Sequence, residues 1–291
     1  MTSSCRYFTF FLFCCSTLLF LQPGAAVGDT EKRSVMLAYI NESPEVSALR
    51  DGLSTNLDID LSIRSNPDAA LCTQNSTILA YGADTVSKIL EACPNQKLVI
   101  ISSHYMINVM SHLLSQDSWG YYMDQPLEYQ VKHADLNMPT IRTLGILYTN
   151  NDSEIDQIKK IQATPHRIGI RAVKVEQGQV AAQIMRELYQ TVDAVLITGN
   201  SEIWPLQDFK TFLVLGMRQN KIMIGGFNYL YTNRGSISAI HTDFHALGIQ
   251  IAKDILDGKR DGYSYFDKRL IVTNDLLSAR YGIFIGGKPT D

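Results

Sequence analysis

The chain has 291 residues, of which 45% are hydrophobic and 19% are charged. This length corresponds to one large domain or two of ordinary size, and the apolar fraction is high enough for a packed core, which excludes a disordered chain. The formal net charge is −3, from 26 basic and 29 acidic residues. Because proteins that bind polyanions usually carry a basic excess, we expect no nucleic-acid partner.

Residues 1–26 predict a secretory signal peptide. Arg6 precedes an apolar run at 8–21, and the small residue pair that ends at Ala26 follows a Pro-Gly break. This is the order of regions in a cleaved signal, and the run is short for a bilayer span, which needs roughly 20 residues. We therefore expect cleavage near Ala26, export to the periplasm and a soluble mature chain.

Two alternatives to a cleaved signal remain open. The apolar run could be kept as an uncleaved N-terminal anchor. A lipoprotein is a weaker alternative, because bulky residues, Leu12 and Phe13, precede the cysteines at 14 and 15.

From residue 35 onward, the chain alternates short apolar runs, which predict buried strands, with helical segments. Ser43 followed by Pro44 predicts a helix start, as N-cap and first helical residue. The strands expected in the first half are 35–40, 59–63, 77–82 and 97–102. The helices expected there are 43–57, 66–72, 84–93, 104–114 and 126–136.

The same pattern restarts at residue 143. The strands expected in the second half are 143–148, 168–175, 194–198, 222–226 and 236–240, and the helices begin near 151, 179 and 244. Such alternation indicates βαβ units and parallel sheets. The predicted fold is therefore α/β, with two Rossmann-like lobes joined by a hinge. We expect an N-terminal lobe of 32–123 plus about 244–260, and a C-terminal lobe of 124–243 plus about 261–291.

Two cysteines, Cys72 and Cys93, remain after cleavage at residue 26. An even pair in an oxidising compartment predicts a disulfide, and two separate reduced thiols are the alternative. Both cysteines end predicted helices, at the amino-terminal edge of adjacent strands. The disulfide would therefore be a structural staple, worth on the order of 3 kcal/mol for a loop of about 20 residues.

No motif predicts a cofactor, a metal site or catalysis. The first turn of each lobe lacks the glycine-rich phosphate fingerprint, so we expect no nucleotide cofactor. The 6 histidines are dispersed, so we expect no metal. The chain has no Gly-x-Ser-x-Gly elbow and no cysteine–histidine pattern, so we do not expect an enzyme.

Five stretches carry a family resemblance. They are AYGA at 80–83, TLGILYTNNDSE at 143–154, VDAVLITGN at 192–200, IGG at 224–226 followed by GSISA at 235–239, and DFHALGIQIA at 243–252. In order and spacing they resemble ABC-transporter substrate-binding proteins of the type 1 periplasmic binding fold, in the tryptophan-binding lipoprotein-like group. The resemblance implies a solute-binding protein that closes on a ligand and delivers it to a membrane ABC permease. The chain departs from the family pattern at 117–122 and 227–228, where ligand would be touched, so the family's ligand is not carried over.

The candidate site follows from the fold, because ligands of parallel α/β sheets bind beyond the carboxyl ends of the strands. Several of the loops there precede helices, whose free N–H groups could bind a carboxylate, and aromatic rings there could stack a ligand. The candidate ligand-binding residues are Asn41, Glu42, Ser43, Asp84, Ser103, His104, Trp119, Tyr121, Asn150, Asn200, Ser201, Glu202, Phe227 and Asn228.

These residue types also have structural interpretations. The acidic residues could cap helices, and Asn200 and Asn228 could serve only turn chemistry. Both tryptophans, Trp119 and Trp204, fall in candidate loops, but about half of the aromatic rings there are expected to pack in the core or at the hinge.

Together these features predict a periplasmic, monomeric solute-binding protein for an amino acid-like or compact planar or apolar ligand. The main alternative is a binding protein of the same fold that signals to a membrane receptor such as a histidine kinase. Less favoured functions are a periplasmic enzyme and a lobe pair kept only for protein contacts.

Overall fold

The computed structural model describes residues 32–73, 76–259, 262–283 and 285. The predicted signal peptide, 1–26, lies outside the described residues. Among the helices of the described part, none is both long and apolar enough to cross a membrane.

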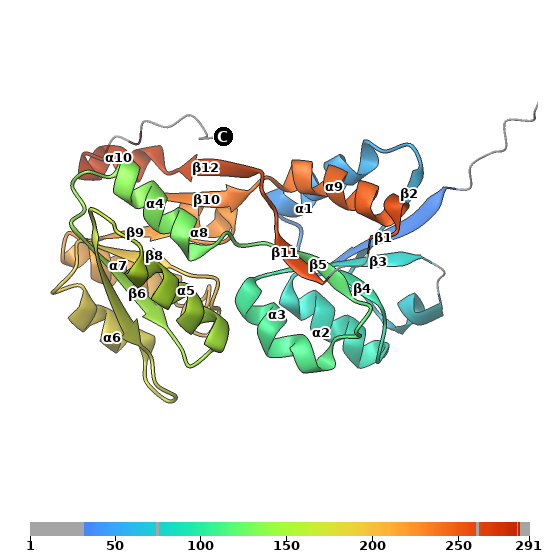
Figure 1. Ribbon diagram of the computed structural model, residues 1–291, viewed down its shortest axis with the longest axis horizontal. Helices are drawn as coiled ribbons and strands as arrows, with labels where there is room; N and C mark the ends of the chain where they lie inside the picture. The colour runs from blue at the N-terminus through green and yellow to red at the C-terminus, as the bar shows by residue number, and fades with distance from the viewer. Residues whose placement is uncertain (1–31, 74–75, 260–261, 284, 286–291) are drawn as a thin grey trace, which may run out of the picture. The chain divides into compact units, whose positions relative to one another are not determined.

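Six parallel strands form the sheet of the first lobe, in the order β11-β5-β4-β3-β1-β2 (Figure 1). The strands are β1 (Arg33–Tyr39), β2 (Ile59–Ser65), β3 (Thr77–Tyr81), β4 (Leu98–Ser102), β5 (Trp119–Tyr122) and β11 (Tyr263–Tyr265). The helical segments of this lobe are α1 (Pro44–Ser54), η1 (Ala69–Thr73), α2 (Ala83–Ala92), α3 (His104–Met110), η2 (Ser111–Leu113) and α9 (Phe244–Asp257).

Side chains on the two faces of this sheet enter two different cores, because successive residues of a strand point to opposite sides. In β1, Val35 and Leu37 pack with α1 and α9, whereas Met36 and Ala38 pack with α2 and α3. Helices α1 and α9 meet backbone to backbone at Gly52, where a Cβ atom would lie 2.1 Å from the carbonyl oxygen of His245. Only glycine fits such a contact. The contact lies where α9 packs against the first lobe.

The second lobe contains a four-stranded parallel sheet, in the order β7-β6-β8-β9, and an antiparallel pair, β10-β12. The strands are β6 (Thr143–Tyr148), β7 (Gly169–Lys174), β8 (Ala194–Ile197), β9 (Ile222–Gly225), β10 (Ser238–Thr242) and β12 (Arg269–Thr273). The helices are α4 (Leu127–Asn137), α5 (Asp152–Ala163), α6 (Ala181–Leu188), α7 (Phe209–Arg218), α8 (Tyr229–Arg234) and α10 (Asp275–Tyr281).

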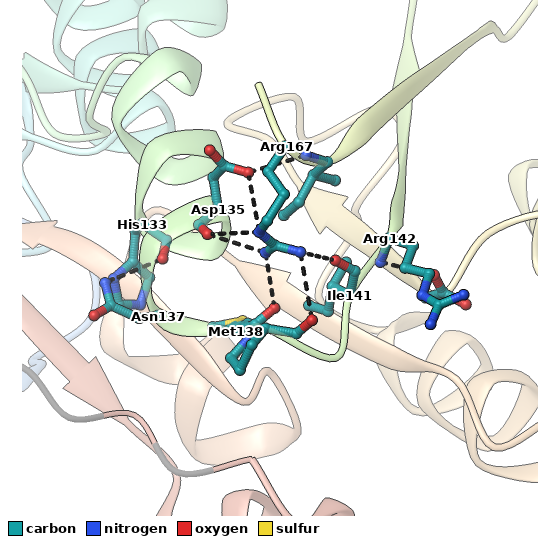
Figure 2. Close-up of polar contacts among 10 residues, drawn as sticks. His133, Asp135, Asn137, Met138, Ile141, Arg142 and Arg167 are labelled. Carbon is teal, nitrogen blue, oxygen red and sulfur yellow. Dashed lines mark hydrogen bonds and ion pairs between the residues drawn. The ribbon is translucent and has the colours of Figure 1, made fainter. Parts of the chain in front are cut away.

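Arg167 ties the end of α4 to the strand that follows α5 (Figure 2). Its guanidinium group donates to the carbonyl oxygens of Asp135 at 3.0 Å, Met138 at 3.2 Å and Ile141 at 2.9 Å. The Asp135 carboxylate in turn accepts the N–H of Ile168 at 2.9 Å. The last carbonyls of a helix have no partner within the helix, and Arg167 supplies one here.

Among the residues that the structure describes, three chain segments connect the lobes, and Gln125 joins them. Its Nε2 atom donates to Thr242 Oγ1 at 2.7 Å and to the carbonyl oxygen of Phe266 at 3.2 Å. Thr242 Oγ1 donates to the carbonyl oxygen of Met123 at 3.0 Å. One side chain thus links the segments that leave β5, β10 and β11.

The structure confirms the α/β fold with two parallel-sheet lobes and the disulfide between Cys72 and Cys93, whose Cα atoms are 5.5 Å apart. The boundary expected near residue 261 lies too early, because β11 pairs with β5 in the first sheet. Residues 119–122, expected to be a loop, form β5.

Candidate functional site

A pocket of about 280 Å³ lies where the loops of the two lobes meet, beyond the carboxyl ends of β1, β3 and β4. We call it the cleft pocket. Its walls on the first lobe are Ile40, Asn41, Ser43, Glu45, residues 81–85, Ser102, Ser103, Met106 and Met123. Its walls on the second lobe are Ser201, Phe227, Asn228 and Leu230. The rule that ligands bind beyond the carboxyl ends of parallel strands selects this place.

Three polar residues of the pocket begin helices. Ser43 caps α1 and accepts the N–H of Val46 at 3.3 Å, and Ser103 caps α3 and accepts the N–H of Met106 at 3.3 Å. Asn228 caps α8. A hydroxyl that accepts one hydrogen bond still has a proton to donate, so Ser43 and Ser103 can each serve a helix and a ligand together.

Glu45 joins the two lobes at the pocket. Its side chain lies in the first turn of α1 and is buried, and its Oε1 atom accepts the N–H of Tyr229, the first residue of α8, at 2.5 Å. A carboxylate at the N-terminal end of a helix is stabilised by the helix dipole. A residue of the first lobe therefore completes the start of a helix in the second.

The charges around the cleft pocket are negative. Among the described residues that line it, Glu45 and Asp84 are acidic and none is lysine, arginine or histidine. Burial, together with the charge of Glu45, raises the pKa of Tyr81 far above its usual range. The Tyr81 phenol is consequently a proton donor at any physiological pH.

The pocket also has an apolar wall, made by Met106 and Met123 of the first lobe and by Phe227 and Leu230 of the second. The Phe227 ring packs on the ring of Tyr231, with centroids 4.9 Å apart. A ligand here would meet acids and hydroxyls together with flexible or aromatic apolar groups.

The structure brings half of the sequence-predicted residues together at this pocket. They are Asn41, Ser43, Asp84, Ser103, Ser201, Phe227 and Asn228. Two more, Asn150 and Glu202, line a second hollow of about 550 Å³ beyond β6 and β7. His104 and Asn200 lie at a cavity of about 10 Å³ where the lobes meet, which we call the lobe junction.

The remaining three predicted residues line none of these three sites. Glu42 lies 3.6 Å from the Arg50 guanidinium group. Trp119 is opposite Val99 at the amino end of β4, beside a hollow of about 560 Å³ on that edge. Tyr121 donates to the buried carboxylate of Asp254.

The aromatic side chains that were expected in ligand-facing loops are instead packed in the cores of the lobes. Trp119 and Tyr121 are two residues apart in β5, so their side chains lie on the same face of the sheet and enter the core shared with α1 and α9. Trp204 is fully buried against Phe212, with ring centroids 5.3 Å apart. Neither tryptophan lines the cleft pocket.

Asn200 has the structural role that was the alternative to ligand binding, because its side chain stabilises the turn that follows it. It is 1% exposed, and its Oδ1 atom accepts the N–H of Glu202 at 2.9 Å. Its Nδ2 atom donates to Glu154 at 2.9 Å. Glu154 also accepts the N–H and the hydroxyl of Thr149, at 2.9 and 2.7 Å. The Asn200 amide is therefore committed to protein partners.

Asp124 is the second buried acid of the lobe junction. One of its oxygens accepts the N–H of His104 at 2.6 Å, and a Cβ atom on Gly199 of the second lobe would lie 2.7 Å from its remaining oxygen. Burial raises the pKa of Asp124 to about 7, with a smaller contribution from the charge of Glu154. Burial also lowers the pKa of His104, so its ring is neutral at neutral pH.

Reasoning from the sequence missed Glu45, Tyr81, Met106, Met123 and Leu230. In sequence, Glu45 looks like an ordinary first-turn acid after a capping Ser-Pro pair, and its role depends on Tyr229, far along the chain. Within the described residues there is no group of three or more His, Cys, Asp and Glu side chains that could hold a metal ion.

The fold is that of type 1 periplasmic binding proteins. A conserved domain protein from Vibrio cholerae is 17% identical, with a TM-score of 0.59, covering 88% of this chain and 96% of that one. An ABC domain in complex with L-Trp from Streptococcus pneumonia is 14% identical, with a TM-score of 0.60 and the same coverages. The ligand-free, open form of a substrate-binding protein with adhesive properties from Clostridium difficile is 12% identical, with a TM-score of 0.62, covering 89% and 97%.

A scan against protein-family models and a search of the curated proteins find no match. The comparisons therefore establish the fold.

Proposed function

We propose that this protein is an exported solute-binding protein, which captures one small molecule in the cleft pocket and delivers it to a membrane ABC permease. The observation that carries the proposal is the pocket itself. It has walls from both lobes, at the sheet edge where ligands of this fold class bind, and it combines acids and hydroxyls with an apolar wall.

Capture would proceed by closure of the lobes on the solute. A ligand that touches both lobes shifts the equilibrium toward the closed state by its differential affinity for that state. Ser43, Asp84 and Ser103 would contact it from the first lobe, and Ser201 and Asn228 from the second. The segments tied together by Gln125 would form the hinge.

No catalytic step is part of this function. The buried acids of the lobe junction are held by protein donors, as Glu154 is by Thr149 and Asn200. In the cleft pocket the two acids share the lining with hydroxyls and apolar groups, as suits a binding site.

The test is native mass spectrometry of the mature protein, purified from its own compartment, before and after denaturation. We expect a small mass that is lost on unfolding, and its identity would name the solute. The proposal fails if no adduct is found and a panel of amines, alcohols, sugars, carboxylates and amino acids leaves the Tm unchanged.

A further inference from the structure

We propose that the solute is an amine without a carboxylate, whose ammonium group binds Glu45 while its compact apolar body lies against Met106 and Phe227. This inference rests on the proposed function and narrows it, from small molecules in general to cations. It follows from the environment of Glu45, from the charged residues that line the pocket and from the apolar residues of the same lining.

Glu45 places in the pocket a carboxylate that has no cation beside it. Glu45 is 5% exposed and lines the pocket. In the described part of the chain Glu45 takes part in no ion pair. A charge removed from water is costly unless it is paired and hydrogen-bonded. The ammonium group of a ligand would supply the missing partner.

The rest of the polar lining disfavours an anionic group. Gly82 at the start of α2 provides no side-chain cap, so this end of the helix attracts negative charge, and Asp84 in the first turn already supplies it. A ligand carboxylate would meet Glu45 and Asp84, and no lysine, arginine or histidine among the described lining residues. This excludes zwitterionic amino acids as the preferred class.

The apolar residues of the pocket determine the size and the apolar character of the rest of the ligand. Met106 and Met123 are flexible and polarizable, and Phe227 and Leu230 approach from the second lobe. A volume of about 280 Å³ fits one compact molecule and lies at the small end for ligand pockets. An aromatic or branched aliphatic amine has this combination of charge and shape.

Glu45 also couples the ammonium group to closure. One of its oxygens accepts the N–H of Tyr229 in the second lobe, and the side chain faces the pocket. A cation bound to the same carboxylate holds it in the orientation that Tyr229 requires. The amine would therefore stabilise the contact between Glu45 and Tyr229. A neutral molecule of the same shape would stabilise this contact less.

The experiment is a charge series on one shape. Phenethylamine, 2-phenylethanol, 3-phenylpropionate and L-phenylalanine are titrated into the ligand-stripped mature protein by calorimetry, and then isoamylamine with its alcohol and carboxylate analogues. We expect each amine to bind at least about tenfold more tightly than its alcohol, as for a hydrogen bond to a charged group, and the carboxylates to bind most weakly.

Two matched variants locate the effect. Glu45→Gln keeps an oxygen that can accept the Tyr229 N–H but removes the charge, so the preference for amine over alcohol should fall to about twofold or less. Glu42→Gln removes a neighbouring acid that lies outside the pocket and contacts Arg50, so the preference should remain. Circular dichroism and the Tm of both variants report whether they are folded.

The inference is overturned if an alcohol or carboxylate binds as tightly as its amine, if Glu45→Gln leaves the preference unchanged, or if no amine of the series binds. It is also overturned if the solute released from the native protein lacks an amine. Where a molecule of a different class binds, the proposed function stands and only the ligand class is wrong. If neither an adduct nor any binding is found, both fail.

Discussion

The cleft pocket and the lobe junction both bury carboxylates near the contact between the lobes, but they satisfy them differently. At the junction, Glu154 accepts three hydrogen bonds from Thr149 and Asn200. In the cleft pocket, Glu45 accepts one, from Tyr229. An acid surrounded by protein donors is part of the framework, whereas a buried acid with room beside it is available to a ligand. Substitutions on the two sides can separate these roles.

The largest expected effect is that of the Asp124 carboxyl group on the pH dependence of the free energy of unfolding. The pKa of Asp124 is raised from 3.8 to about 7 in the folded protein, so the native state holds this proton more tightly than the unfolded chain. The free energy of unfolding should therefore fall as pH rises from about 4 to 7, by on the order of 4 kcal/mol from this group.

Asp124→Asn removes this titration. Urea unfolding of both proteins at pH 4, 5, 6, 7 and 8 measures it, and the variant should show a flatter profile and greater stability at pH 8 than the parent. Equal slopes for the two proteins would mean that Asp124 is not the titrating group. Glu154, whose pKa burial also raises, would then be the next group to test.

The next effect concerns the junction network. Glu154→Ala leaves three donors of Thr149 and Asn200 without their acceptor, which should cost about 2–4 kcal/mol of unfolding free energy. Glu154→Gln keeps an acceptor oxygen and should lose less than half as much. Urea denaturation of the two variants decides between a network role and a charge role. An equal loss of unfolding free energy in both variants would contradict the network role of Glu154.

A smaller effect is expected from crowding the junction. A Cβ atom at Gly199 would lie 2.7 Å from a carboxylate oxygen of Asp124. Because this clash is between the lobes, we expect Gly199→Ala to weaken solute binding, by roughly 1–3 kcal/mol of binding free energy. Gly169→Ala is the control, since its nearest contact would be an ordinary 3.6 Å. Calorimetry with the released solute measures both. Unchanged affinity for Gly199→Ala would show that the bound state does not use this contact.

The weakest effect should come from Arg167, which caps the end of α4 but is partly exposed. Arg167→Ala should lower the unfolding free energy by about 1 kcal/mol, because hydrogen bonds of a charged group are weakened by solvent at the surface. Solute affinity should stay the same, since the residue lies away from the pocket. A loss of affinity would show that the second lobe transmits strain to the cleft.

Much of the fold is predictable from the sequence, because strands buried on both faces are visible as apolar runs. Residues 35–40, 97–102 and 143–148 are such runs, and each covers most or all of a strand of the structure. The strands β5 and β11 are short and rich in tyrosine, so they resemble aromatic loops in sequence. Only pairing with β4 and with each other makes them strands.

The site is predictable as a set of loops but not as a set of side chains. The carboxyl-end rule selects Ser43, Asp84 and Asn228, because strand direction alone places them at one edge. It cannot place Trp119, whose side chain is directed into the core by the alternation of β5. Nor can it identify Glu45, whose role needs the approach of Tyr229, 184 residues later.

Solute capture in the cleft pocket is tested most sharply by the affinity of the released solute for a protein whose pocket has been filled. Ser201→Trp places an indole in the pocket, whereas Gln96→Trp places one at the hollow on the opposite edge of the first sheet. We predict that calorimetry detects no binding to folded Ser201→Trp and unchanged binding to Gln96→Trp. Unchanged binding to Ser201→Trp would show that the solute binds elsewhere and would contradict capture in the cleft pocket.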